Sequence, residues 1–321
     1  MMDIIFSPLV LQHETGTHHP ENPRRFSFFN ELPPVEIPDG EAFLGLVHLP
    51  GYIERIKDLS QSGGHLDLDT SCSKGSFTAA KAAVGATILA AQNNGFALVR
   101  PPGHHAFIAR ASGFCIFNNI AIACKHLVNQ GKRVFILDFD GHYGDGTASF
   151  FYDSNQVLYL SLHQSPGFPW EGNFDEIGNR DGKGYTINVP LPPGTGDDLY
   201  LKALERLLPV AMEFNPDVVA ISAGFDGHWS DRLLHLRLSL NLYYRIGVII
   251  GSHFPAVFAS LEGGYQPEIL YKGVLNFIAG IKKEAIPFPE MPTTSNEKTQ
   301  DFFEDNFGQL IRQLKTYWKS V

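Results

Sequence analysis

The stretch VFILDFDGH, residues 134–142, joins a continuous apolar run to a cluster of acidic residues and a histidine. Similar short apolar runs recur along the chain, and each ends abruptly in a polar or glycine-rich turn. They are Ile4–Phe6, Phe96–Val99, Val134–Leu137, Val157–Leu162, Val218–Ser222 and Ala256–Leu261. Strands that are apolar throughout are buried on both faces, which is typical of a parallel sheet between two layers of helices.

Longer segments with helical character separate these runs. They are Gly75–Asn93, Asn118–Gln130, Leu199–Phe214, Leu240–His253 and Pro267–Lys283. The alternation predicts an α/β protein with a single open parallel sheet and helices on both faces. We expect a catalytic domain over residues 1–284, a linker over 285–299 and a C-terminal helix within 300–321 that packs on the domain.

Composition excludes several classes of protein. Of the 321 residues, 44% are hydrophobic, which excludes a disordered chain, a collagen-like chain and a coiled coil. The 34 acidic residues exceed the 25 basic ones, so we expect no direct binding of nucleic acid. No apolar run suggests a membrane span, and no signal peptide is visible. Three cysteines without a Cys-x-x-Cys pair indicate a cytoplasmic protein.

Polar clusters follow four of the predicted strands. They are Arg100–His105, Asp138–His142, Ser222–His228 and Glu262–Tyr265. Ligands of open α/β sheets bind outside the carboxyl ends of the strands. We therefore expect the four clusters to converge on one polar site.

Asp140 and His142 have the spacing of a metal-binding pair. Two residues apart in an extended segment, their side chains lie on the same side. A carboxylate and an imidazole suit a divalent ion, and a third ligand from another strand end would leave one position open for catalysis. An isolated Asp-x-His pair is often only a surface turn, but Asp226 after a second buried strand favours a metal site.

The tandem pair His104-His105 is a candidate for general acid–base work. The two side chains diverge after a rigid Pro-Pro-Gly turn, so each needs its own partner. Asp138 and Asp145 could each hold one imidazole in a single tautomer, which raises its basicity.

Tyr265 follows two glycines, and two roles are open for it. It is either a core tyrosine after a turn or a phenol donor aimed at an oxyanion, with Gly263 and Gly264 letting the loop approach closely. Metal, base and oxyanion donor together describe metal-assisted hydrolysis of an acyl bond.

With these residues the chain resembles the zinc-dependent histone deacetylase superfamily, which includes acetylpolyamine amidohydrolases and acetoin-utilisation proteins. It is most similar to class II-like, bacterial-type members, and the resemblance runs from about His13 to Lys283. The motifs that carry it are His18–Arg25, Val47–Tyr52, Leu68–Thr70, Arg100–Ala106, Gly113–Asn119, Asp138–Thr147, Ser161–His163, Ser222–His228 and Glu262–Tyr265. The resemblance implies the arginase/deacetylase fold.

The resemblance also implies a role for each site residue. One zinc ion per chain would be bound by Asp140, His142 and Asp226, and would supply Lewis acidity and lower the pKa of water. His105 matches the general base and His104 its electrostatic partner. Tyr265 matches the residue that polarises the acyl oxygen.

Further positions match binding sites of the family. One or two structural potassium ions are implied, the first at Asp138, Asp140, His142, Ser161 and Leu162, the second at Phe151, Ser154, Val157 and Tyr185. Phe114 and Phe168 match the walls that hold an acyl-lysine chain, with Gly113, Leu233 and Gly264 beside them. Arg25 matches a residue of the inner acetate channel.

Three residues depart from the family pattern and leave the substrate open: Tyr143, Trp170 and Arg232. Acylated lysine in a protein or peptide is the expected substrate, because Leu233 is apolar where polyamine-selective relatives carry an acid. An acetylated small amine, above all an acetylpolyamine, is the alternative. A two-manganese ureohydrolase would need more bridging aspartates. An inactive binding module would be expected to lack a ligand, the base or the tyrosine.

Overall fold

The structure of the protein, a computed structural model, describes residues 2–321 and is built on a seven-stranded sheet. The strand order is β1-β4-β9-β8-β5-β6-β7, and every neighbouring pair is parallel. The strands are β1 (Ile4–Ile5), β4 (Phe96–Ala97), β5 (Val134–Asp138), β6 (Val157–Gln164), β7 (Thr186–Leu191), β8 (Val218–Ala223) and β9 (Val257–Leu261). The predicted open parallel sheet is confirmed.

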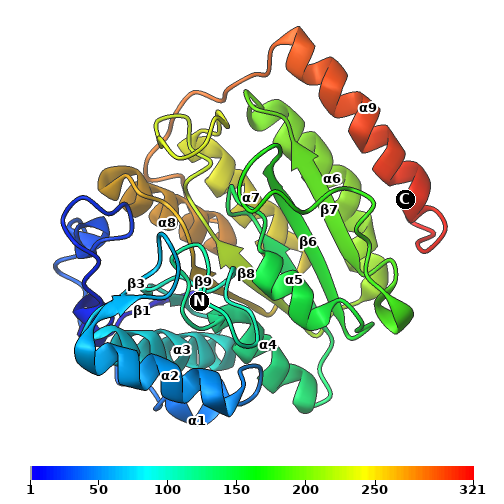
Figure 1. The fold of residues 1–321 in the computed structure, drawn as a ribbon. Coiled ribbons are helices and arrows are strands. Elements are labelled where there is room, and N and C mark those ends of the chain that lie inside the picture. Colours follow the sequence, from blue (N-terminus) through cyan, green and yellow to red (C-terminus); the bar gives the residue numbers. More distant parts are fainter. Residues whose placement is uncertain (1) are drawn as a thin grey trace.

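Helices cover both faces of this sheet (Figure 1). The helices α3 and α4 lie on one face, and α6, α7 and α8 lie on the other. The helices are α1 (Glu41–Leu44), α2 (Pro50–Ser62), α3 (Ser76–Asn93), α4 (Asn119–Asn129), α5 (Asp145–Phe151), α6 (Asp197–Phe214), α7 (Leu240–His253), α8 (Pro267–Lys282) and α9 (Glu297–Leu314). Within residues 2–321, none has both the length and the apolar character of a transmembrane helix.

Burial explains which strands the sequence predicted. Every residue of β5 and β8 is buried, as their continuous apolar sequences require. The strand β7 was not predicted, because its apolar residues alternate with polar ones and Pro190 interrupts it. The strand lies at the edge of the sheet, where a proline without an N–H is tolerated. Other elements that were not predicted are the short α1 and α5, the amphipathic α2 and the small β2–β3 pair (Gly64–His65 and Ser71–Cys72).

The C-terminal helix begins earlier than expected. It starts at Glu297, inside the predicted linker, because the side chain of Asn296 accepts the N–H of Thr299 and caps the helix. The residues before it are tied down as well, since the N–H of Ser295 donates to Asp198 at 3.0 Å. Figure 1 shows α9 beside α6 and β7.

The register of the central strands brings their carboxyl ends level. Asp138, the last residue of β5, pairs with Ser161 of β6 on one side and with Ser222 of β8 on the other. Ser222 in turn pairs with Ser260 of β9. The polar segments that follow β5, β8 and β9 therefore leave the sheet side by side.

Candidate metal centre and active site

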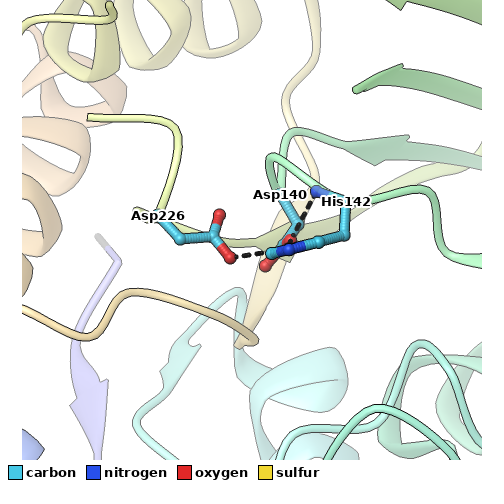
Figure 2. Close-up of side chains that lie close together, drawn as sticks. All are labelled: Asp140, His142 and Asp226. Carbon is cyan, nitrogen blue, oxygen red and sulfur yellow. Dashed lines mark hydrogen bonds and ion pairs between the residues drawn. The ribbon is translucent and has the colours of Figure 1, made fainter. Parts of the chain in front are cut away.

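Asp140, His142 and Asp226 converge beyond the carboxyl ends of β5 and β8 (Figure 2). One potential ligand atom from each lies within 4.8 Å of the other two. Backbone N–H groups hold the carboxylates in place: Gly263 donates to Asp140 Oδ2 at 2.7 Å, and Gly141 donates to Asp226 Oδ1 at 2.8 Å. The backbone thus orients both carboxylates and leaves one oxygen of each facing the imidazole.

The chemistry of this group fits a divalent cation. His142 Nδ1 lies 3.1 Å from Asp140 Oδ1 and 2.9 Å from Asp226 Oδ2. One ring nitrogen carries at most one proton, so it cannot satisfy both oxygens. Burial opposes protonation, but the Asp226 and Asp140 charges still raise the pKa of His142 to about 10. The group therefore needs a positive charge, which an ion bound by one nitrogen and two oxygens would supply.

The tandem histidines have separate carboxylate partners. His104 Nδ1 lies 3.1 Å from Asp138 Oδ2, and His105 Nδ1 lies 2.7 Å from Asp145 Oδ1. Burial lowers the pKa of His105 to about 4, assisted by the charge of His104. Burial acts on His104 too, but the charges of Asp140 and Asp138 raise its pKa well above the ordinary value. The pKa values of the two rings are therefore shifted in opposite directions, which favours the neutral form of His105 and the charged form of His104.

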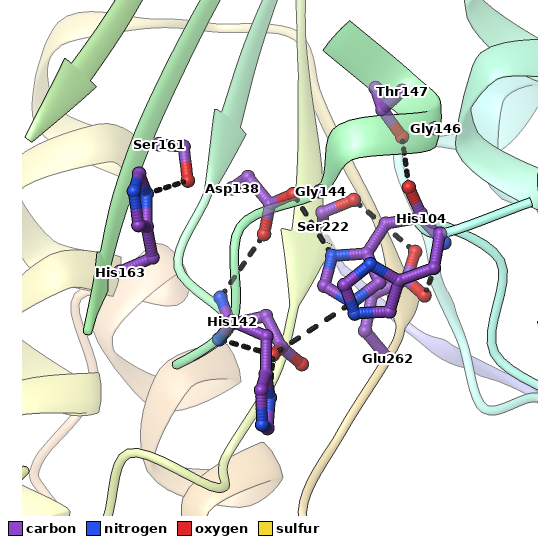
Figure 3. A network of polar contacts seen from close by, with 12 residues as sticks. His104, Asp138, His142, Gly144, Gly146, Thr147, Ser161, His163, Ser222 and Glu262 are labelled. Atoms are coloured by element: carbon purple, nitrogen blue, oxygen red, sulfur yellow. Dashed lines mark hydrogen bonds and ion pairs between the residues drawn. The ribbon is translucent and has the colours of Figure 1, made fainter. Parts of the chain in front are cut away.

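Glu262 holds the backbone that leads into His104 (Figure 3), a role that was not predicted from the sequence. Its Oε2 accepts the N–H groups of Gly103 at 2.6 Å and His104 at 3.1 Å. Ser222 Oγ donates to Oε1 at 3.2 Å. Burial raises the pKa of Glu262 to about 7. Its position directly after a strand was the available signal, but its partners lie on distant segments.

The loop that carries Tyr265 approaches the metal ligands closely. A Cβ atom at Gly263 would lie 2.2 Å from Asp226 Oδ2, and Gly264 has a φ of +115°, so both positions require glycine. On its other side the loop is bonded to the buried Arg25. The Nε of this arginine donates to the Gly264 carbonyl at 2.7 Å, and its guanidinium lies 5.0 Å from the Tyr265 ring.

A pocket of about 220 Å³ opens above these groups. Its lining residues are Asp69, His105, Gly113, Phe114, His142, Phe168, Leu233 and Tyr265. A side chain at Gly113 would meet the His105 ring at 2.5 Å, so a glycine keeps this wall open. Asp69 belongs to the Leu68–Thr70 motif but was not predicted to line the site. Gly264, which was predicted beside the substrate, is not among the residues that line the pocket.

The predicted potassium residues lie on or directly beside β5, α5, β6 and β7. At the first predicted site, Asp138 and Ser161 are register neighbours, and Ser161 Oγ bonds His163 Nδ1 at 2.8 Å. At the second, Phe151 ends α5 and Val157 begins β6. The carbonyl of Phe151 accepts the N–H of Ser154 at 2.9 Å, and that of Tyr185 accepts the N–H of Tyr159 at 2.8 Å.

The three departures from the family pattern lie in different surroundings. Tyr143 is buried, and its ring centroid lies 4.9 Å from that of His163. Trp170 is 74% exposed and has a φ of +69°. Arg232 is exposed beside Leu233. Only Tyr143 therefore packs inside the fold.

The chain is similar to known proteins in both sequence and fold. A family model described as the histone deacetylase domain matches residues 19–281. A probable deacetylase of Archaeoglobus fulgidus is 36% identical over 98% of both chains. Histone deacetylase 8 of Arabidopsis thaliana is 36% identical over 85% of this chain and 77% of its own. The crystal structure of the HDA15 HD domain has a TM-score of 0.89 and 29% identity, and the match covers 99% of this chain and 96% of that one.

Proposed function

Because the chain belongs to the histone deacetylase family, whose members are hydrolases of acetylated amines and amides, we propose that it is a zinc-dependent amidohydrolase of acyl-lysine. The substrate would be a protein or peptide, and the acyl group chiefly acetyl. One observation carries the proposal: His142, a member of the Asp140, His142 and Asp226 group, lines a single pocket together with His105 and Tyr265.

Each side chain has a task that follows from its contacts. A zinc ion held by Asp140, His142 and Asp226 would supply Lewis acidity toward the acyl oxygen and water. The bond from His105 Nδ1 to Asp145 leaves Nε2 free to take a proton from water and to deliver it to the departing amine. The hydroxyl of Tyr265 donates to the acyl oxygen as negative charge develops there.

The remaining predicted residues are proposed to bind rather than react. Phe114 and Phe168, which line the pocket, would enclose the aliphatic part of the acylated side chain. Arg25 lies behind the Tyr265 loop, where the acetate product would leave. The two groups of potassium residues, which begin at Asp138 and Phe151, would hold one or two structural potassium ions.

Replacing Tyr265 with Phe tests the assigned oxyanion donor. The variant loses one hydroxyl and keeps the aromatic ring, which packs edge-on against Phe114 with 5.7 Å between the ring centroids. We expect kcat to fall by about 10²–10³-fold, the usual effect of losing one oxyanion donor, while metal content stays normal. Near-normal turnover of an acetyl-lysine peptide would contradict the role of the phenol.

The rim of the pocket favours acyl-lysine over acetylpolyamine. Leu233 lines the rim and is 41% exposed, so it offers an apolar surface to the substrate stem. Asp69 lines the same pocket and is the feature that favours the polyamine alternative. A panel of acetyl-lysine peptides, acetylspermidine and acetylputrescine, with metal analysis of the same sample, decides between them. We expect higher kcat/KM for the peptides, and a clear preference for the polyamines would reverse the assignment.

Leu233→Glu is expected to shift this preference. A carboxylate at the rim would meet the second ammonium group of an acetylpolyamine, whereas leucine offers it no partner. The ratio of kcat/KM values should move toward acetylpolyamines by about 1–2 kcal/mol, or roughly 5–30-fold. Leu233→Gln is the matched control, because it has nearly the same shape without the charge. An equal shift in both variants would show that charge is not the cause.

A further inference from the structure

Asp231 connects two segments of the pocket wall. It lies in the loop between β8 and α7, and its side chain is 6% exposed. The Oδ1 atom accepts the backbone N–H of Leu233 at 3.1 Å, and the Oδ2 atom accepts that of Tyr265 at 2.9 Å. Each oxygen of one carboxylate thus holds the backbone of a different pocket-lining residue.

A local turn does not explain this arrangement. The bond to Leu233 closes an Asx turn, for which a single oxygen is enough and which serine or asparagine also form. Within residues 2–321, both oxygens bond backbone N–H groups rather than a basic side chain. Burying a carboxylate without a cation lowers stability. The second bond, to another loop, is therefore the one that requires an explanation.

Other bonds hold the Tyr265 loop at Gly263 and at Gln266, on either side of the tyrosine. Gly263 and Gly264 precede the tyrosine and have no side chains of their own. Arg25 bonds the loop carbonyls from behind, and Gln266 Nε2 donates to the carbonyl of Ser230 at 2.7 Å. The N–H of Tyr265 itself is bonded by Asp231.

We propose that Asp231 is a positioning residue for deacylation, which fixes the Tyr265 backbone against the Leu233 rim and so sets the place of the phenol. The inference rests on the proposed function. A misplacement of about 1 Å can lower the rate of an enzyme by about 10²-fold. Losing the bond to Tyr265 should therefore affect turnover more than substrate binding.

The test is a double-mutant cycle with Tyr265→Phe. Asp231→Asn keeps the volume, but its amide nitrogen cannot accept an N–H, so one of the two bonds is lost and the Tyr265 backbone is no longer tied to that of Leu233, whichever bond remains. With an acetyl-lysine peptide, we expect kcat to fall about 10–100-fold, KM to change by less than about threefold, and zinc content to stay normal. In the Tyr265→Phe background the same substitution should lower kcat by less than about threefold, because the positioned hydroxyl is already absent.

Asp197→Asn is the matched control. Asp197 is 2% exposed and accepts the backbone N–H groups of Ser239 at 2.9 Å and Thr293 at 3.3 Å. Neither of these residues lines the pocket. The control variant should unfold at a lower temperature and keep kcat within about twofold of the unmodified enzyme.

Asp231→Ser provides a second variant if the asparagine variant does not fold. Its hydroxyl can still close the turn to Leu233, but it is too short to hold the Tyr265 N–H as well. Equal losses of kcat in the two backgrounds, or loss of zinc from the folded variants, would overturn the positioning role. If the unmodified enzyme and Tyr265→Phe are equally inactive on every acylated amine, the proposed function itself fails, and that result is visible before Asp231 is changed.

Discussion

Asp226→Ala is expected to remove the metal and the activity together. The candidate centre offers one nitrogen and two carboxylates, so the loss of one carboxylate leaves two ligands for an ion that needs three from the protein. Metal content should fall from about one zinc per chain to near zero. Turnover of an acetyl-lysine peptide should fall by at least about 10³-fold, because the Lewis acid is lost rather than a single proton transfer.

The measurement is elemental analysis of the purified variant alongside a deacetylation assay. Asp198→Ala serves as the control, because Asp198 bonds Ser295 near α9 and lies outside the pocket. That variant should keep its zinc. Full metal occupancy in Asp226→Ala would disprove the assigned ligand set, and activity without metal would disprove the proposed zinc dependence.

His105→Ala is expected to separate chemistry from metal binding. The imidazole faces the pocket and its Nδ1 is bonded to Asp145 rather than to the metal ligands. Zinc content should therefore stay normal, while kcat falls by about 10²–10⁴-fold, the usual contribution of a general acid–base group. Single-turnover assays of metal-loaded protein measure this loss directly.

Asp145→Asn is the informative companion to this variant. The variant keeps the ring of His105 but removes the carboxylate charge that holds this ring in one tautomer. Its kcat should therefore fall less than that of His105→Ala. A metal-loaded His105→Ala enzyme with near-normal turnover would show that another group is the base. His104, the other buried imidazole of the tandem pair, would be the next residue to test.

The polar clusters of the candidate site and the strands before them could be predicted from the sequence, because both are local properties. A strand that is buried on both faces is apolar throughout, as β5 and β8 are, and its end is visible where Asp138 or Ser222 interrupts the run. The edge strand β7 and the helix α5 could not be predicted in this way. In β7, apolar residues alternate with polar ones and a proline interrupts them, so the segment does not resemble a buried strand. The helix α5 has only seven residues, beginning at Asp145, which is too short for a clear helical periodicity.

The residues that hold the site together depended on the tertiary structure. Glu262 contacts Gly103 and His104, and Asp231 contacts Tyr265, each across a long stretch of chain. Such partners are set by strand register and loop packing, which a single sequence does not display. The sequence by itself determined the central strands, the polar segments at their ends and the residue types gathered there, since these follow from local periodicity and chemistry. Only the tertiary structure decided which backbone groups orient each side chain, because a hydrogen bond requires two atoms within about 3 Å.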